Sequence, residues 1–166
     1  AGTPEVAAKT LQVLIDDPRF RQFEVVGVLT REDAPLGRKR VMTPSPVAAV
    51  AEAAGVATVK ANRIDSETES EIRALGAELA VVIAYGVLLK QSTLDLLPKG
   101  WFNLHFSLLP ELRGAAPVQR ALIAGDKVTG VSLFKLDAGM DTGALAGVVA
   151  TEVQPDETAG DLLMRL

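Results

Sequence analysis

Leu79-Ala80-Val81-Val82-Ile83-Ala84 is a nearly continuous apolar run, and it decides the fold class. The run lacks the apolar–polar alternation of a strand with one solvated face, so it is typical of a parallel strand that is covered on both faces. Even when it is extended to Leu89, it contains Tyr85 and Gly86 and stays far shorter than the roughly 20 apolar residues of a membrane-spanning helix. The run therefore predicts a core strand.

Helical patterns and strand-like runs alternate on both sides of this strand. Helices are expected at 3–16, 46–55, 66–76 and about 117–124, with a last one starting at 158–161. Their first three N-caps are expected at Thr3, Ser45 and Ser66. Strands are expected at 23–29, 56–59, 101–105, about 131–136 and about 144–151. The alternation predicts an α/β domain with a doubly wound, mostly parallel sheet, which binds ligands beyond the carboxyl ends of its strands.

Residues 30–46 interrupt the alternation. Their prolines and Gly37 leave no room for a regular element, so a long loop is expected there, with the basic cluster Arg38-Lys39-Arg40 on it. Taken alone, such a charge run is typical of a solvated loop. The net charge of −4 argues against broad charge neutralisation of nucleic acid, so any RNA contact would be local.

The length of 166 residues suits one domain, 1–166. The amino terminus has neither a basic start nor an apolar signal segment, and the chain has no cysteine, which fits a cytoplasmic protein without a membrane segment. The chain opens at a helix start and ends inside a helical pattern. We therefore expect a preceding core strand and a continuation of the chain to be missing, so that the domain is truncated at both ends.

Two polar side chains lie near the end of the strand expected at 101–105. Asn103 and His105 are two residues apart, so both point to the same face, where an amide and an imidazole could polarise a carbonyl and move a proton. His105 is the only histidine, and a lone histidine is more often structural than catalytic. Asp141 lies between glycines in a later loop, where it could equally be a turn residue.

The chain resembles the formyltransferases that use 10-formyltetrahydrofolate, over nearly all its residues. The resemblance depends on four motifs in order: Asn103-Leu104-His105, Ser107-Leu108-Leu109-Pro110, Arg113-Gly114-Ala115-Ala116-Pro117-Val118-Gln119 and Asp137-Ala138-Gly139-Met140-Asp141-Thr142-Gly143. It differs from many relatives at Phe106, where a small residue is usual, and at Lys90, where proline is common. These differences concern the substrate amine and the pocket rim.

The resemblance implies a Rossmann-like domain that transfers a formyl group, with Asn103, His105 and Asp141 as the catalytic residues. It implies that 10-formyltetrahydrofolate, the only cofactor expected, binds along two stretches; no metal is expected. The stretches are Val87, Leu88 and Leu89, and Ser107, Leu108, Leu109 and Pro110. Without the resemblance, Val87 to Leu89 would be interpreted as plain core.

The resemblance also bears on the acceptor. Residues 113–119 and the loop at 30–46 are similar to the branch that formylates initiator methionyl-tRNA for translation initiation, with Arg38, Lys39 and Arg40 as tRNA contacts. The resemblance further implies a basic C-terminal domain, which we expect to be missing from this chain, and a monomer is expected. The alternatives are a formyltransferase for an amino-sugar nucleotide, a domain that hydrolyses 10-formyltetrahydrofolate, and a noncatalytic nucleotide-binding domain. The last lacks support because the chain has neither a G-x-G-x-x-G nor a P-loop pattern.

Overall fold

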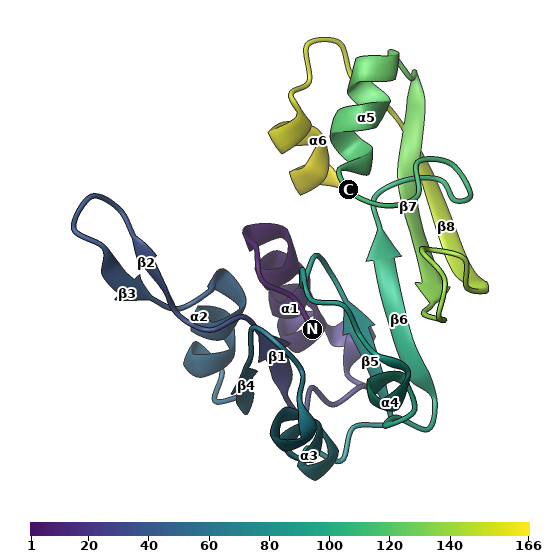
Figure 1. Ribbon diagram of the computed structural model, residues 1–166. Helices are drawn as coiled ribbons and strands as arrows, with labels where there is room; N and C mark the ends of the chain where they lie inside the picture. The colour runs from purple at the N-terminus through teal and green to yellow at the C-terminus, as the bar shows by residue number, and fades with distance from the viewer. The chain divides into compact units, whose positions relative to one another are not determined.

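The computed structural model describes residues 1–166, which form two compact units, Ala1–Lys99 and Gly100–Leu166. In both units helices connect the strands, as Figure 1 shows. None of these helices combines the length and the apolar character that crossing a membrane requires. The predicted α/β class is confirmed.

The first unit contains short strands flanked by helices. β1 (Val28–Thr30) and β4 (Thr58–Lys60) pair in parallel, and Gly2 and Ile83 form an isolated parallel bridge. The other elements are α1 (Glu5–Asp16), the 3-10 helix η1 (Pro18–Phe20), β2 (Ala34–Leu36), β3 (Val41–Thr43), α2 (Pro46–Ala53), α3 (Ser66–Ala74), β5 (Leu79–Val82) and α4 (Gln91–Leu94).

The expected helix caps are confirmed at α2 and wrong at α3. The Ser45 hydroxyl accepts a hydrogen bond from the Ala48 amide at 3.0 Å. At α3, Asp65 caps the helix in place of Ser66. Its carboxylate accepts hydrogen bonds from the Thr68 amide and hydroxyl, and these bonds hold the pKa of Asp65 below its ordinary value. An ionised carboxylate is the stronger acceptor for a helix N-terminus, which explains the shift by one residue.

The start of the chain also differs from expectation. Thr3 does not cap α1: Pro4 takes the cap position, and the Thr3 hydroxyl donates to the Tyr85 carbonyl at 3.1 Å. The strand expected at 23–29 begins only at Val28, after irregular backbone. Helix α4 was not expected, because four residues carry no detectable periodicity.

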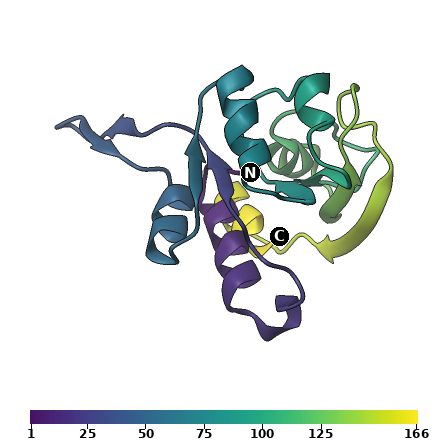
Figure 2. The same ribbon diagram turned by 90° about the horizontal axis from the view of Figure 1, so that it is seen from below.

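A β-hairpin replaces the long loop expected at 30–46. β2 and β3 pair antiparallel through Pro35 and Met42, and Gly37 and Arg40 take positive φ angles of 70° and 49° in the turn. Figures 1 and 2 show the hairpin projecting from the rest of its unit. The expectation was wrong because three-residue strands that are exposed on both faces have no apolar alternation, and proline is tolerated in such a two-stranded edge.

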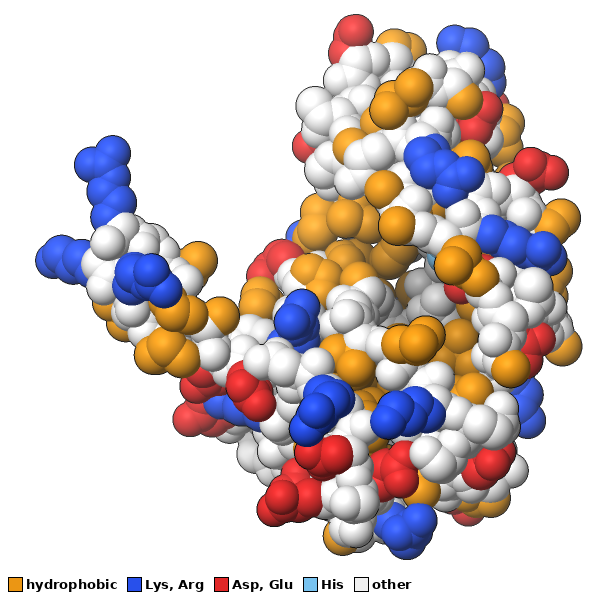
Figure 3. Space-filling model, viewed as in Figure 1, with side chains coloured by type: hydrophobic (Ala, Val, Ile, Leu, Met, Phe, Trp, Pro, Cys, Tyr) orange, Lys and Arg blue, Asp and Glu red, His pale blue; other side chains and the backbone are white.

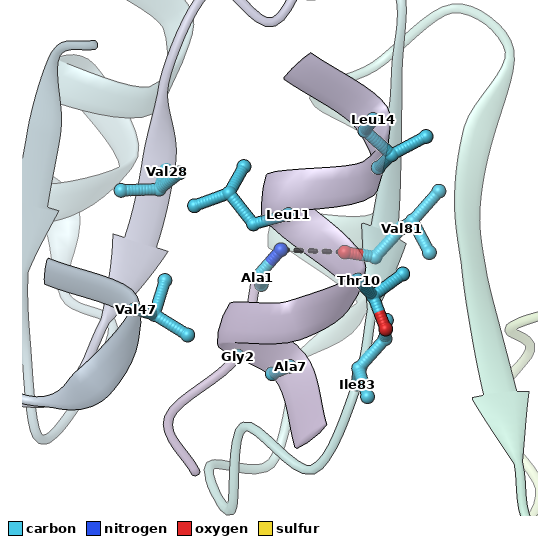
Figure 4. Close-up of a pocket in the computed structure, with 10 residues that line it drawn as sticks. All are labelled: Ala1, Gly2, Ala7, Thr10, Leu11, Leu14, Val28, Val47, Val81 and Ile83. Atoms are coloured by element: carbon cyan, nitrogen blue, oxygen red, sulfur yellow. Dashed lines mark hydrogen bonds between the residues drawn. The ribbon is translucent and has the colours of Figure 1, made fainter. Parts of the chain in front are cut away.

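Apolar packing holds the first unit together. Helix α1 faces α2, β1 and β5 across a small cavity of about 50 Å³, which Figure 4 shows in close-up. Within it the Ala1 amino group donates to the Val81 carbonyl. The cavity lining is almost wholly apolar and consists of Ala1, Gly2, Ala7, Thr10, Leu11, Leu14, Val28, Val47, Val81 and Ile83.

The second unit is a meander of antiparallel strands with two helices. In strand order it contains β6 (Gly100–His105), β7 (Val128–Lys135) and β8 (Leu145–Glu152), with α5 (Pro117–Ala124) and α6 (Ala159–Arg165) packed on each other. Strand pairing in the chain is therefore mixed. Residues 136–144 are too few for a parallel crossover, which needs a dozen or more residues, so β7 and β8 are antiparallel.

Burial in the second unit is centred on one face of β7. Phe134 of β7, Ala121 of α5 and Leu162 of α6 are fully buried, whereas β8 is an exposed edge strand. Helix α6 begins where the sequence predicted a last helix, and there the Thr158 hydroxyl caps the helix and Asp161 completes a capping box. The core on β7 thus supports the end of β6 that carries the polar residues described next.

Candidate active site

Strand β6 presents Asn103 and His105 on the same face, since side chains on a strand point alternately to its two faces. Asn103 lies opposite Phe134 of β7, and His105 lies opposite Ser132. Asn103 is half-buried and its amide makes no hydrogen bond inside the protein, so it can donate to a ligand. His105 is buried, with its ring edge-on to Phe134 at a centroid distance of 6.5 Å.

The contacts of the His105 imidazole indicate which of its two nitrogens donates a hydrogen bond. Its Nε2 atom lies 3.0 Å from the carbonyl oxygen of Leu112. A carbonyl only accepts, so Nε2 carries the proton and donates it. Whenever the ring is neutral, Nδ1 therefore has the free lone pair, and Nδ1 is the nitrogen that can take up or release a proton during a reaction.

Asp141 is the acid on the Nδ1 side of the ring. Its Oδ2 atom lies 3.7 Å from Nδ1 of His105, too far for a direct hydrogen bond but close enough for strong attraction once Nδ1 is protonated. The same oxygen accepts a hydrogen bond from the Gly114 amide at 2.7 Å. The structure thus brings His105 and Asp141 together from two separate motifs.

The Asp141 loop has a backbone that its sequence permits. Asp141 adopts a φ of 53°, in the left-handed region that aspartate tolerates better than most residues. Asp137 closes the loop by accepting hydrogen bonds from the Gly139 amide at 3.0 Å and the Thr142 hydroxyl at 2.8 Å. At Gly143 a Cβ atom would lie 1.7 Å from a backbone oxygen of β7, so only glycine fits there.

The segment 107–114 after β6 folds back on itself. The Ser107 hydroxyl donates to the Glu111 carbonyl at 2.6 Å, and the segment includes a cis peptide bond before Pro110. The Ser132 hydroxyl of β7 fixes the segment in place by donating a hydrogen bond to the Ser107 carbonyl and accepting one from the Leu109 amide. This folding places the Leu112 carbonyl against His105.

The residues expected to bind folate are distributed over both units. Val87 and Leu89 are half-buried in the first unit, and Leu88 is 90% exposed, which does not fit plain core. In the second unit, Leu108 and Leu109 are half-buried and Pro110 is exposed. Ser107 is buried, and its hydroxyl is engaged within the loop, so its side chain is a structural support of this segment.

The residues expected to contact tRNA lie at the tip of the β2–β3 hairpin. Arg38, Lys39 and Arg40 are exposed, and Figure 3 shows cationic side chains gathered there beside apolar ones. The exposed apolar side chains of the hairpin include Leu36, Val41 and Met42. The cluster is therefore presented to solvent on a narrow projection, next to apolar surface.

Sequence reasoning missed the two groups that orient His105 and its loop. The Leu112 carbonyl is a backbone group, and the positive φ of Leu112, 55°, has no signal in a leucine side chain. Ser132 had a weak signal, a serine among the apolar residues of a core strand. No group of three or more His, Asp or Glu side chains that could hold a metal ion lies in the structure.

Three comparisons with known proteins bear on this arrangement. The formyl transferase family model matches residues 2–166. The methionyl-tRNA formyltransferase of Arthrobacter sp. (strain FB24) is 51% identical over 166 residues, covering all of this chain and 53% of that protein. The chain thus spans about half the length of this curated relative.

Two solved structures have a similar fold. Phosphoribosylglycinamide formyltransferase from Bacillus halodurans is 21% identical, with a TM-score of 0.78 over 99% of this chain and 84% of that one. The sugar 3N-formyl transferase WlaRD, solved in the presence of dTDP and 5-N-formyl-THF, is 18% identical, with a TM-score of 0.65 over 99% of this chain and 54% of that one. The Rossmann-like fold predicted from the sequence is confirmed.

Proposed function

The chain belongs to the formyl transferase family, and we propose that it is the catalytic domain of a methionyl-tRNA formyltransferase, which formylates initiator methionyl-tRNA for translation initiation. The observation that carries the proposal is the His105 imidazole, with Nε2 tied to a carbonyl and Nδ1 beside Asp141. The 51% identity to the Arthrobacter methionyl-tRNA formyltransferase supports the choice of acceptor.

The proposed reaction moves a formyl group between two nitrogens. The methionyl amine attacks the formyl carbon, a new N–C bond forms, and the carbonyl oxygen becomes an oxyanion. The Asn103 amide donates a hydrogen bond to that oxygen, an interaction typically worth about 10²–10³ in rate. The C–N bond to the folate then breaks, and the departing N10 receives a proton.

His105 and Asp141 carry the proton in this scheme. Nδ1 of His105 accepts a proton from the attacking amine, and the Asp141 carboxylate at 3.7 Å stabilises the imidazolium that results. The proton then passes to the leaving N10. The hydrogen bond from the Gly114 amide keeps the carboxylate in place throughout.

The proposed formyl donor is 10-formyltetrahydrofolate. WlaRD, a structural relative, was solved with a formylated folate. A pterin ring is flat and apolar with polar edges, which fits the exposed Leu88 and the half-buried Val87 and Leu89 as a hydrophobic wall. In the second unit Leu108, Leu109 and Pro110, which follow His105 closely in sequence, are proposed as folate contacts on the strength of the family resemblance, and Ser107 supports their segment.

The β2–β3 hairpin is proposed to contact the tRNA. Three consecutive cations at its tip, Arg38, Lys39 and Arg40, suit phosphate oxygens, and the exposed Val41 and Met42 suit unstacked bases. A projecting hairpin also explains how a chain of net charge −4 can bind RNA, because the contact is local. We propose that the domain, residues 1–166, acts as part of a cytoplasmic monomer.

A competition assay on the intact protein tests this function. Formyl transfer from 10-formyltetrahydrofolate is measured to initiator methionyl-tRNA, to an amino-sugar nucleotide and to water. Transfer to the tRNA alone is expected. Preferential transfer to the sugar nucleotide, or release of formate without an acceptor, would overturn the assignment. Substitution of Arg38 by Ala is expected to raise the KM for tRNA severalfold and to leave the KM for the folate unchanged.

A further inference from the structure

Ser132 is a fully buried hydroxyl directly opposite His105 in the pairing of β6 with β7. It donates to the Ser107 carbonyl at 2.7 Å and accepts from the Leu109 amide at 3.0 Å. A buried hydroxyl destabilises a core strand unless it is hydrogen-bonded. Both hydrogen bonds are made to residues 107–109, so the Ser132 hydroxyl stabilises that segment rather than its own strand.

The hydrogen bonds of the segment lead from Ser132 back to His105. The Ser107 hydroxyl donates to the Glu111 carbonyl at 2.6 Å, and the Glu111 amide donates to the Leu108 carbonyl at 3.0 Å. The next carbonyl, that of Leu112, receives the Nε2 proton of His105. His105 and Ser132, which are paired across β6 and β7, therefore hold the two ends of one loop.

We propose that Ser132 is a positioning residue for formyl transfer. By holding the loop at Ser107 and Leu109, it places the Leu112 carbonyl so that the proton of the neutral His105 ring stays on Nε2 and Nδ1 remains free beside Asp141. The hydrogen bond at one ring nitrogen decides which tautomer a histidine adopts. The inference rests on the proposed function, because it assigns the proton transfer to His105.

Kinetics of the intact protein test the proposal with three variants. Ser132→Ala removes both bonds and is expected to lower kcat about 10- to 100-fold, as small misplacements of catalytic groups do, with a smaller rise in KM for the formyl donor, because Leu109 belongs to the proposed donor site. Ser132→Thr keeps the hydroxyl and is expected to restore most of kcat. Thr129→Val is the matched control, since Thr129 is a buried hydroxyl on the same strand without a bond to the loop, and it is expected to keep full kcat.

The tautomer itself is measured by ¹⁵N NMR of the imidazole nitrogens, with the His105→Gln protein identifying the His105 signals by their loss. Wild type, Ser132→Thr and Thr129→Val are expected to carry the proton on Nε2 alone, and Ser132→Ala a mixture of the two tautomers. This reading holds even if the protein transfers no formyl group, so failure of the proposed function is distinguished from failure of the inference.

Two results overturn the inference. One is a folded Ser132→Ala protein with wild-type kcat and the proton still on Nε2. The other is a Ser132→Ala protein that loses thermal stability only, with kcat per folded molecule and the tautomer unchanged. If Ser132→Ala does not fold, Ser107→Ala opens the same loop at the Glu111 carbonyl, and an unchanged tautomer in that protein would overturn the inference as well.

Discussion

Substitution of Asp141 by Asn removes the charge beside Nδ1 of His105 and little else. The two side chains are nearly the same size, and the Asn carbonyl oxygen can still accept the Gly114 amide hydrogen bond that Oδ2 accepts at 2.7 Å. The loop is therefore expected to keep its conformation. What disappears is the attraction between carboxylate and imidazolium.

The distance sets the size of the effect. At 3.7 Å, and with both side chains largely buried, this attraction is on the order of 4 kcal/mol at an effective dielectric constant of about 20. Each 1.4 kcal/mol changes a rate about tenfold. Because the amide dipole and nearby water recover part of the loss, kcat of Asp141→Asn is expected to fall about 100- to 1000-fold.

Steady-state formyl transfer to methionyl-tRNA measures this effect, with thermal unfolding to verify the fold. Asp137→Asn is the matched control: it removes one negative charge from the same loop, and its amide oxygen retains both acceptor positions. Its kcat is expected to stay within about twofold of wild type. A folded Asp141→Asn protein with kcat within about threefold of wild type would refute the electrostatic role of Asp141.

Three further predictions concern the oxyanion, the loop glycine and the core tyrosine. Asn103→Ala is expected to lower kcat about 10²–10³-fold without changing the circular dichroism spectrum. In urea unfolding, Gly143→Ala is expected to lose about 3 kcal/mol, since its Cβ would lie 1.7 Å from a backbone oxygen. Gly147→Ala, with open space around the Cβ, is expected to change by less than about 0.5 kcal/mol. Burial raises the pKa of Tyr85 to about 12 from an ordinary 10.0, so the folded state favours the neutral phenol. Its contribution to stability is complete below pH 10 and is lost as pH rises from 10 to 12, and the unfolding free energy of Tyr85→Phe is expected to vary less over that range.

Most of the helices could be predicted because their ends carry chemical signals. Pro117 opens α5 and Gly125 closes it at a φ of 74°, and α6 begins within the Thr158–Asp161 segment where a helix start was expected. Where two capping residues are adjacent, as at Asp65 and Ser66, the sequence could not decide between them. In the structure Asp65, whose charged carboxylate is the stronger acceptor, caps α3.

The hairpin and the antiparallel pairing were harder to predict for physical reasons. A three-residue strand such as Ala34–Leu36, exposed on both faces, has no apolar pattern to detect. Strand direction follows from the path of the connection, and α/β alternation alone favours parallel pairing. The short connection before Leu145 was the available sign that β8 returns antiparallel.

The side chains of the candidate site could be predicted from the sequence, whereas its backbone groups could not. Strand spacing placed Asn103 and His105 on one face, whereas Asp141 was linked to them only by family resemblance. The structure places Asp141 at the imidazole, and the catalytic role of all three residues remains a prediction. The Leu112 carbonyl depends on a left-handed backbone at a leucine, which no sequence pattern indicates.

The most direct test of the account is single-turnover formyl transfer by the intact protein and its His105→Ala variant, with 10-formyltetrahydrofolate as donor and initiator methionyl-tRNA as acceptor. The wild-type protein is expected to formylate the tRNA, and the folded variant is expected to lose at least about 10³-fold in rate, as loss of proton transfer and of imidazolium stabilisation requires. A folded His105→Ala protein that formylates the tRNA at a near-wild-type rate would contradict the account.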